Sequence, residues 1–181
     1  LSLLRTFHDQ TKGVNFLRWN LHQSVTPPAT LANPAPVSRA CHFWLACSSE
    51  DSSVVVYDTQ NAASAPTDNV GTDVFMPGRG ALVVLKGHKG SVKGVSWSPH
   101  SAGLLLSAST DYTAQLWDVS AAVVSGVGQT FEASEMDGTE QMVALANFRG
   151  HEGRVLCVCW SQLDPHTIYT GSDDQTVRTW D

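Results

Sequence analysis

Two sets of side chains in the 181-residue sequence have the residue types of a hydrolase triad. Each set combines a histidine, a hydroxyl residue and an aspartate, in that order along the chain. Such a set could support nucleophilic attack by the hydroxyl after proton transfer to the histidine. The two sets are His88, Ser107 and Asp111, and then His151, Thr170 and Asp174.

Repetition of the set argues against catalysis. An active site occurs once in a domain, whereas these residues recur in the same order and at the same offsets. The sequence also lacks the Gly-x-Ser-x-Gly turn that exposes the nucleophile in α/β hydrolases. We therefore predict that the chain is not an enzyme, has no catalytic residue and needs no cofactor, and that both sets are structural.

The cysteines are the other candidates for chemistry. Cys157 and Cys159 stand two residues apart in an apolar run, so on a strand both side chains point to one face. With Cys41 and His42 they could suggest a metal site, but they lack partners at the spacing that zinc ligands need. Small free thiols in a sheet core are far more common. We expect buried core cysteines, no metal site and a reducing compartment.

The elements that would position these residues form an internal repeat. An aromatic-Asp pair recurs three times, with an aspartate six residues before each aromatic side chain. A Gly-His pair lies 29 residues before the last two aromatics, and a tryptophan follows each of these histidines by nine residues. The aromatic-Asp pairs are Tyr57-Asp58, Trp117-Asp118 and Trp180-Asp181, the Gly-His pairs are Gly87-His88 and Gly150-His151, and the later tryptophans are Trp97 and Trp160.

Each repeat contains short apolar runs separated by turn residues, which is typical of strands in an all-β protein. No segment shows helical periodicity over a useful length. The best-defined predicted strands span residues 82–86, 92–97, 104–109, 113–117, 144–149, 155–160, 167–172 and 176–180.

The repeat resembles the WD repeat, a four-stranded unit opened by Gly-His and closed by Trp-Asp. The resemblance implies a buried hydrogen-bond chain in which the aspartate holds the histidine ring, the histidine reaches the hydroxyl and the hydroxyl meets the indole N–H. In the second unit this network is His88, Asp111, Ser107 and Trp117, and in the third it is His151, Asp174, Thr170 and Trp180. The first unit departs, because Cys47 replaces the hydroxyl residue and Tyr57 replaces the tryptophan.

The resemblance implies a fold and its boundaries. We expect an all-β WD40 β-propeller fragment with two complete four-stranded blades plus partial blades of a seven-bladed propeller, each fourth strand coming from the start of the next unit. The remaining propeller blades would lie elsewhere in a longer chain. The expected repeat units are 1–58, with an insertion at about 21–40, then 81–118 and 144–181, joined by loops 59–80 and 119–143.

Charge is predicted to be sorted between the two ends of the blades. The net charge is −6, from 11 Lys and Arg against 17 Asp and Glu, which argues against a generally basic nucleic-acid binder. The two later insertions, in loops 59–80 and 119–143, are mainly acidic. Basic residues gather around the repeat histidines: Arg5, Lys12, Arg18, Lys86, Lys89, Lys93, Arg149 and Arg154.

The sequence of the last two units resembles that of a narrower family. This is the gem-associated protein five family, whose members are RNA-recognising subunits of the survival-of-motor-neuron complex. The similarity covers the whole chain in order and is most specific over 82–118 and 147–181. It includes Trp97-Ser98-Pro99-His100, Leu106-Ser107-Ala108-Ser109, Asn147-Phe148-Arg149-Gly150-His151 and Leu163-Asp164-Pro165.

This resemblance implies a non-enzymatic scaffold that recognises single-stranded small nuclear RNA during spliceosomal ribonucleoprotein assembly and mRNA processing. Other subunits of the complex would be partners, no membrane would be involved, and the protein would be cytoplasmic and also nuclear. Of three RNA-contacting positions in the family, Arg154 matches, whereas Ser91 and Thr110 stand where the family has Lys and Tyr. We expect Lys89 or Lys93 to replace the missing charge and Tyr112 to replace the ring. Arg154, Tyr112 and Lys89 would then line one edge of the RNA path. The alternative is a WD-repeat scaffold that binds only proteins.

Overall fold

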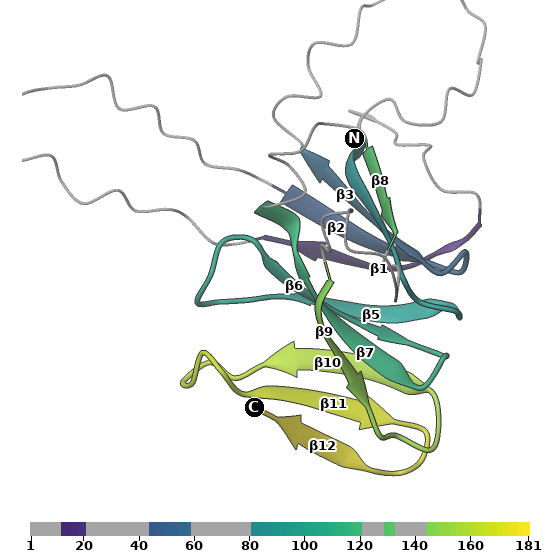
Figure 1. Cartoon of the computed structure of the whole chain (residues 1–181), viewed down its shortest axis with the longest axis vertical. Helices are drawn as coiled ribbons and strands as arrows, with labels where there is room; N and C mark the ends of the chain where they lie inside the picture. The colour runs from purple at the N-terminus through teal and green to yellow at the C-terminus, as the bar shows by residue number, and fades with distance from the viewer. Residues whose placement is uncertain (1–11, 21–43, 59–80, 121–128, 133–143) are drawn as a thin grey trace, which may run out of the picture.

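The fold is seen in a computed structural model, which describes residues 12–20, 44–58, 81–120, 129–132 and 144–181. These residues form three β-sheets that pack face to face in chain order (Figure 1). The sheets are almost entirely antiparallel, and their strands are mostly six residues long, as the short apolar runs predict. The all-β prediction is confirmed.

The first sheet contains strands β1 (Val14–Trp19), β2 (Trp44–Ser49), β3 (Ser53–Asp58) and β4 (Ala81–Lys86). The second contains β5 (Val92–Trp97), β6 (Leu104–Ser109), β7 (Thr113–Asp118) and β9 (Ala144–Arg149). The third contains β10 (Val155–Trp160), β11 (Ile168–Ser172) and β12 (Val177–Trp180).

The strand order confirms that repeats and sheets are offset. Strand β4 opens the second repeat but pairs antiparallel with β3 of the first sheet. In the same way, β9 opens the third repeat but pairs with β7 of the second sheet. Two four-stranded antiparallel sets and a three-stranded one therefore correspond to the predicted two complete blades and partial blade.

One strand was not predicted. Segment 119–143, expected to be a loop, contains β8 (Gln129–Glu132), which pairs in parallel with the outer edge of β4. Strand β4 would otherwise present a row of unpaired backbone groups, and adding a strand satisfies them. The insertion at about 21–40 and the predicted loop 59–80 lie outside the described residues.

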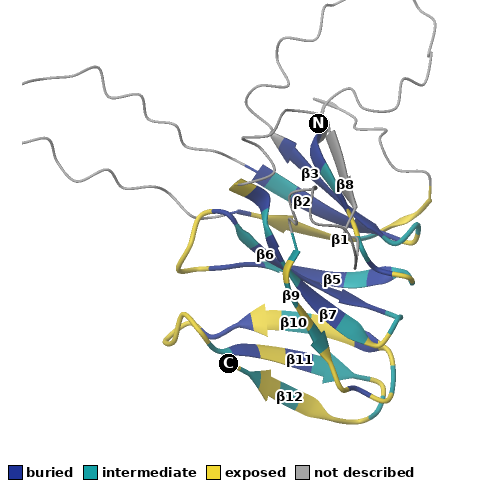
Figure 2. Ribbon diagram, in the orientation of Figure 1, coloured by how far each residue is buried: buried dark blue, intermediate teal, exposed yellow. Residues whose placement is uncertain are grey.

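The core lies between the sheets. Val54, Val56 and Leu85 of the first sheet pack with Leu105 and Trp117 of the second. A second cluster joins Leu106 of the second sheet to Trp160 and Ile168 of the third. Strands β2, β5 and β6 of the first two sheets are mostly buried (Figure 2). Fully burying such side chains contributes about 1.5–3 kcal/mol each, so packing between sheets is a main source of stability.

The outer face of the third sheet corrects the expectation for the cysteines. Cys157 and Cys159 are both exposed rather than buried. Tyr169 and Val177 of the same sheet are 36 % and 76 % exposed, and the exposed stretches of this sheet are visible in Figure 2. The period-two pattern does place the cysteines away from the second sheet, but the described residues put no further sheet against them.

Candidate nucleic-acid interface

The second sheet contains a buried chain of side-chain hydrogen bonds. His88 Nδ1 lies 3.0 Å from Asp111 Oδ2, and His88 Nε2 lies 2.7 Å from Ser107 Oγ. The indole N–H of Trp117 donates to the same Oγ at 2.8 Å. With Nδ1–H donating to the carboxylate, Nε2 accepts from the Ser107 hydroxyl. The chain links the Gly-His loop to the two middle strands of the sheet, β6 and β7.

The third sheet repeats this arrangement. His151 Nδ1 lies 2.7 Å from Asp174 Oδ2, and His151 Nε2 lies 2.8 Å from Thr170 Oγ1. Trp180 donates its indole N–H to Thr170 Oγ1 at 2.8 Å. The hydroxyl residue is buried in both sheets, and its oxygen already has two partners. A substrate cannot reach a hydroxyl in this position, so the geometry gives the sets a structural role.

The first sheet departs from the other two in sequence at two positions of this network. Cys47 and Tyr57 lie in one buried cluster with Val55. Burial raises the pKa of the Cys47 thiol to about 12, which keeps it protonated and unreactive. The histidine of this repeat, His8, lies outside the described residues.

The network aspartates also build the turns at one end of the sheets. Each accepts a hydrogen bond from the backbone N–H two residues later, at 2.9–3.0 Å. The residue between them adopts a left-handed backbone conformation in all three turns, with φ values of 66–73°. These intervening residues are Ser52, Tyr112 and Gln175.

The carboxylates in these turns are strongly acidic. For Asp111, burial alone would raise the pKa, but the hydrogen bond and charge of His88, with donors from Thr113 and the Lys89 backbone, hold it below its usual range. For Asp174, the Thr176 hydroxyl is the largest cause that lowers the pKa, and His151 adds to it. Both side chains are therefore ionised at neutral pH.

Lys89 and Tyr112 lie on adjoining turns of the second sheet. The Lys89 backbone N–H donates to Asp111 Oδ2 at 2.8 Å, which ties the Gly-His loop to the turn that carries Tyr112. The Tyr112 side chain is 50 % exposed. A tyrosine with positive φ is unusual, because this left-handed conformation is sterically strained for a residue with a large side chain.

Arg154 lies on the corresponding loop of the third sheet. Its Nε is 2.5 Å from Asp173 Oδ2, and no hydrogen bond joins it to Tyr112 in the described part of the chain. The turns match between sheets, because Asp173 N–H donates to the Arg154 carbonyl and Thr110 N–H donates to the Ser91 carbonyl. The structure thus places all three predicted contacts at one end of the sheets, but only Lys89 and Tyr112 on adjoining turns.

Two polar residues at this end were not predicted from the sequence to be part of the site. Asn15 of β1 donates to Ser91 Oγ at 3.0 Å and accepts from Lys93 Nζ at 3.3 Å. Glu50 lies 3.9 Å from the same ammonium group. Lys93 of the second sheet is therefore held by two residues of the first sheet. Glu50 directly precedes a turn aspartate, as Asp173 does, and this shared position could have identified it.

Charge differs between the two ends of the described sheets. At the end that carries the Gly-His loops the network aspartates are turned inward, and basic side chains gather there beside Glu50, Glu152 and Asp173. The opposite end has carboxylates with Arg18 as the described cation of β1. The basic group is Lys12, Lys86, Lys89, Lys93, Arg149, Arg154 and Arg178, and the acidic group at the opposite end includes Asp118, Asp164 and Asp181.

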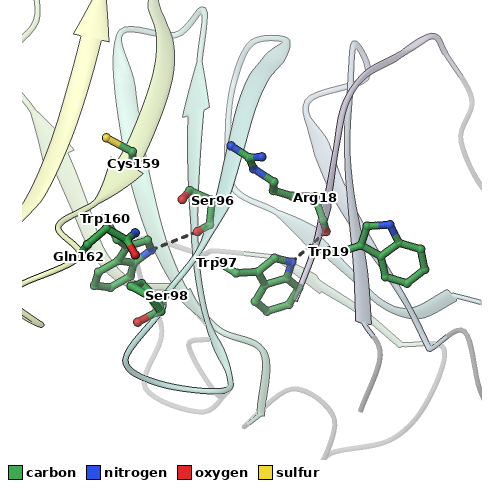
Figure 3. Close-up of a pocket in the computed structure, with 9 residues that line it drawn as sticks. Arg18, Trp19, Ser96, Trp97, Ser98, Cys159, Trp160 and Gln162 are labelled. Atoms are coloured by element: carbon green, nitrogen blue, oxygen red, sulfur yellow. Dashed lines mark hydrogen bonds between the residues drawn. The ribbon is translucent and has the colours of Figure 1, made fainter. Parts of the chain in front are cut away.

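That opposite end contains a cavity of about 410 Å³ at the ends of β1, β5 and β10 (Figure 3). Trp97 donates its indole N–H to the Arg18 carbonyl at 3.0 Å, and Trp160 donates to the Ser96 carbonyl at 3.1 Å. Both indoles are buried between sheets. Trp19, at the end of β1, is by contrast 48 % exposed, because the described residues provide no sheet on its far side.

Two segments match the family described as WD domain, G-beta repeat, over residues 80–118 and 142–181. Together with the offset four-stranded sheets, these matches establish that the chain carries two WD repeats in a β-propeller-like arrangement. Proteins built from this repeat generally serve as non-enzymatic scaffolds for interactions.

Neither a metal site nor a membrane-spanning helix is present among the described residues. No group of three or more His, Cys, Asp or Glu side chains is placed to hold a metal ion. Within the same residues, no helix is long and apolar enough to cross a membrane.

Proposed function

We propose that the end of the sheets carrying Lys89, Tyr112 and Arg154 binds single-stranded RNA, and that the chain acts as an RNA-binding WD-repeat scaffold. The observation that carries this proposal is Tyr112. An exposed aromatic ring stands at a turn apex with φ 73°, beside a loop that carries a lysine. The equivalent turns have the small or polar residues Ser52 and Gln175, so the turn itself does not need a ring.

The chemistry of the three side chains suits an unpaired strand. A base can stack on an exposed aromatic face, which contributes about 1–3 kcal/mol per base. Lys89 supplies a point charge for a phosphate, and Arg154 supplies a charged planar group that can stack or bind phosphate through two nitrogens. Distant acidic residues do not prevent this, because screening limits their reach to about 8–10 Å.

The particular RNA follows from the resemblance to the gem-associated protein five family. We infer that the RNA is small nuclear RNA, bound during spliceosomal ribonucleoprotein assembly, and that other subunits of the survival-of-motor-neuron complex are partners. This role places the protein in the cytoplasm and the nucleus. Arg154 supports the inference because it retains the residue type of the family at its position.

The proposal is tested by replacing Tyr112 with glycine in the full-length protein. Glycine favours the left-handed conformation that Tyr112 adopts, so the turn is retained while the ring is removed. We expect the dissociation constant for a labelled single-stranded Sm-site RNA to rise about fivefold or more. Tyr169→Ala is the matched control, because Tyr169 is also exposed but lies on the outer face of the third sheet. Equal affinity of the glycine variant and the parent would refute stacking on Tyr112.

A second function, a scaffold that binds only proteins, is favoured by a different observation. A cavity of about 420 Å³ lies between the second and third sheets, at the end opposite to Tyr112. Its floor is apolar, with Leu104, Leu116 and Phe148, and its rim includes His100. Ultraviolet crosslinking of the full-length protein to small nuclear RNA separates the two functions, since a protein-only scaffold gives no RNA adduct.

A further inference from the structure

The guanidinium group of Arg154 is held from one side by a carboxylate. The contact joins Arg154 Nε to Asp173 Oδ2 at 2.5 Å, and Arg154 has no other hydrogen-bond or ion-pair partner in the described part of the chain. The arginine side chain is 59 % exposed and the aspartate side chain is 28 % exposed. The two terminal nitrogens of the guanidinium therefore have no hydrogen-bond partner among the described residues. The arginine is also the more exposed of the two side chains.

The carboxylate is itself fixed in place. The Asp173 N–H donates to the Arg154 carbonyl at 3.0 Å, so the two residues are joined by backbone as well as by side chains. A Cβ atom on residue 153 would collide with Asp173 Oδ1, and Gly153 leaves that space open. Asp173 is therefore seated between the backbone of the loop and the inner edge of the guanidinium.

The equivalent turns show how the pair of Asp173 and Arg154 differs from its counterparts. Glu50, Thr110 and Asp173 all donate their backbone N–H to the facing strand or loop at 2.9–3.0 Å. Glu50 pairs with Lys93, and Asp173 pairs with Arg154. The facing residues differ, because Glu50 faces Gly13 and Thr110 faces Ser91, whereas Asp173 faces Arg154. Of these three turn residues, only Asp173 forms an ion pair with the residue that it faces.

We propose that Asp173 is a positioning residue for Arg154: it holds the Nε edge so that the terminal nitrogens face a phosphodiester of the bound strand. This inference rests on the proposed RNA-binding function. A free arginine loses much rotamer freedom when it binds a phosphate, and ordering its planar group beforehand reduces that loss. An exposed ion pair adds little to stability, so its effect is on binding rather than on folding.

The test uses the sign of an effect on RNA affinity. Asp173→Asn removes one negative charge near the RNA, which by electrostatics alone would tighten binding. Positioning predicts the reverse, a dissociation constant raised about threefold to tenfold for a single-stranded Sm-site RNA bound to the full-length protein. Glu152→Gln is the matched control, because it removes the same charge from the facing loop at the same end of the sheet. In the described part of the chain, Glu152 donates its backbone N–H to Asp174 and forms no ion pair with Arg154, so this variant should leave binding unchanged or tighter.

Two further variants separate this inference from the proposed function. In an Arg154→Ala background, Asp173→Asn should cause no additional loss, and Arg154→Lys, which lacks the planar fork, should bind as weakly as Asp173→Asn. Tighter or unchanged binding by Asp173→Asn overturns the positioning role, as does an additional loss in the alanine background. If Arg154→Ala itself binds RNA like the parent, the proposed contact by Arg154 fails instead.

Discussion

Single hydroxyl groups hold the polar core of each WD repeat together. Ser107 Oγ accepts from Trp117 and bonds to His88, so one oxygen satisfies two buried polar side chains. Leaving a buried polar group unpaired costs about 1–3 kcal/mol. The importance of such a residue comes from the groups that it satisfies rather than from its own size.

We therefore expect Ser107→Ala to lower the free energy of unfolding by about 2–4 kcal/mol, because two buried groups lose a partner. Chemical denaturation monitored by tryptophan fluorescence measures the change. Ser107→Thr is the control and should be close to neutral, since Thr170 fills the same position in the third sheet. A loss for alanine no larger than that for threonine would contradict this account.

The strands were well predicted because their apolar runs face neighbouring sheets, and that requirement leaves a pattern in the sequence. Strand β8 left no such pattern, since its place depends on the open edge of β4. Trp19, Cys157 and Cys159 have the pattern of buried residues but are exposed, because burial depends on what stands opposite. The candidate site could be predicted only in part from the sequence, because the contacts of Glu50 and Asp173 join residues that lie far apart in the chain.

Close approach between strands β5 and β10 depends on one glycine. A Cβ atom at Gly94 would lie 3.2 Å from the Leu156 carbonyl oxygen, which belongs to the facing strand and cannot rotate away. We expect Gly94→Ala to destabilise the protein by about 1–3 kcal/mol through overpacking. Gly13→Ala is the control, because its nearest neighbour would be at an ordinary 3.7 Å. Thermal unfolding measures both, and equal effects would contradict the packing argument.

At the scale of the whole molecule, the turn carboxylates couple stability to acid. The pKa values of Asp111 and Asp174 are lowered in the folded state, so the unfolded chain binds protons more readily. Their contribution to stability is complete well above the usual aspartate pKa of 3.8 and is lost as pH falls from there toward the lower folded-state values. These residues therefore make folding sensitive to acid rather than to alkali.

Asp111→Asn should flatten the dependence of unfolding free energy on pH below about pH 4, besides lowering stability at neutral pH. Urea titrations at a series of pH values measure the slope. Asp164→Asn is the comparison and should flatten the slope less, because the lowered pKa of this exposed carboxyl comes from a local turn outside the buried network. An unchanged slope in the Asp111 variant would show that acid sensitivity arises elsewhere.

The tryptophan contacts at the ends of β5 and β10 give the array a direction. Each indole reaches back to a carbonyl of the preceding sheet, Trp97 to Arg18 and Trp160 to Ser96. Removing the C-terminal sheet would free only a carbonyl, whereas removing the N-terminal sheet would strand a buried indole donor. Deleting the first sheet should therefore destabilise the second sheet more than deleting the third sheet does. A recombinant fragment of the first and second sheets should resist protease longer than a fragment of the second and third sheets.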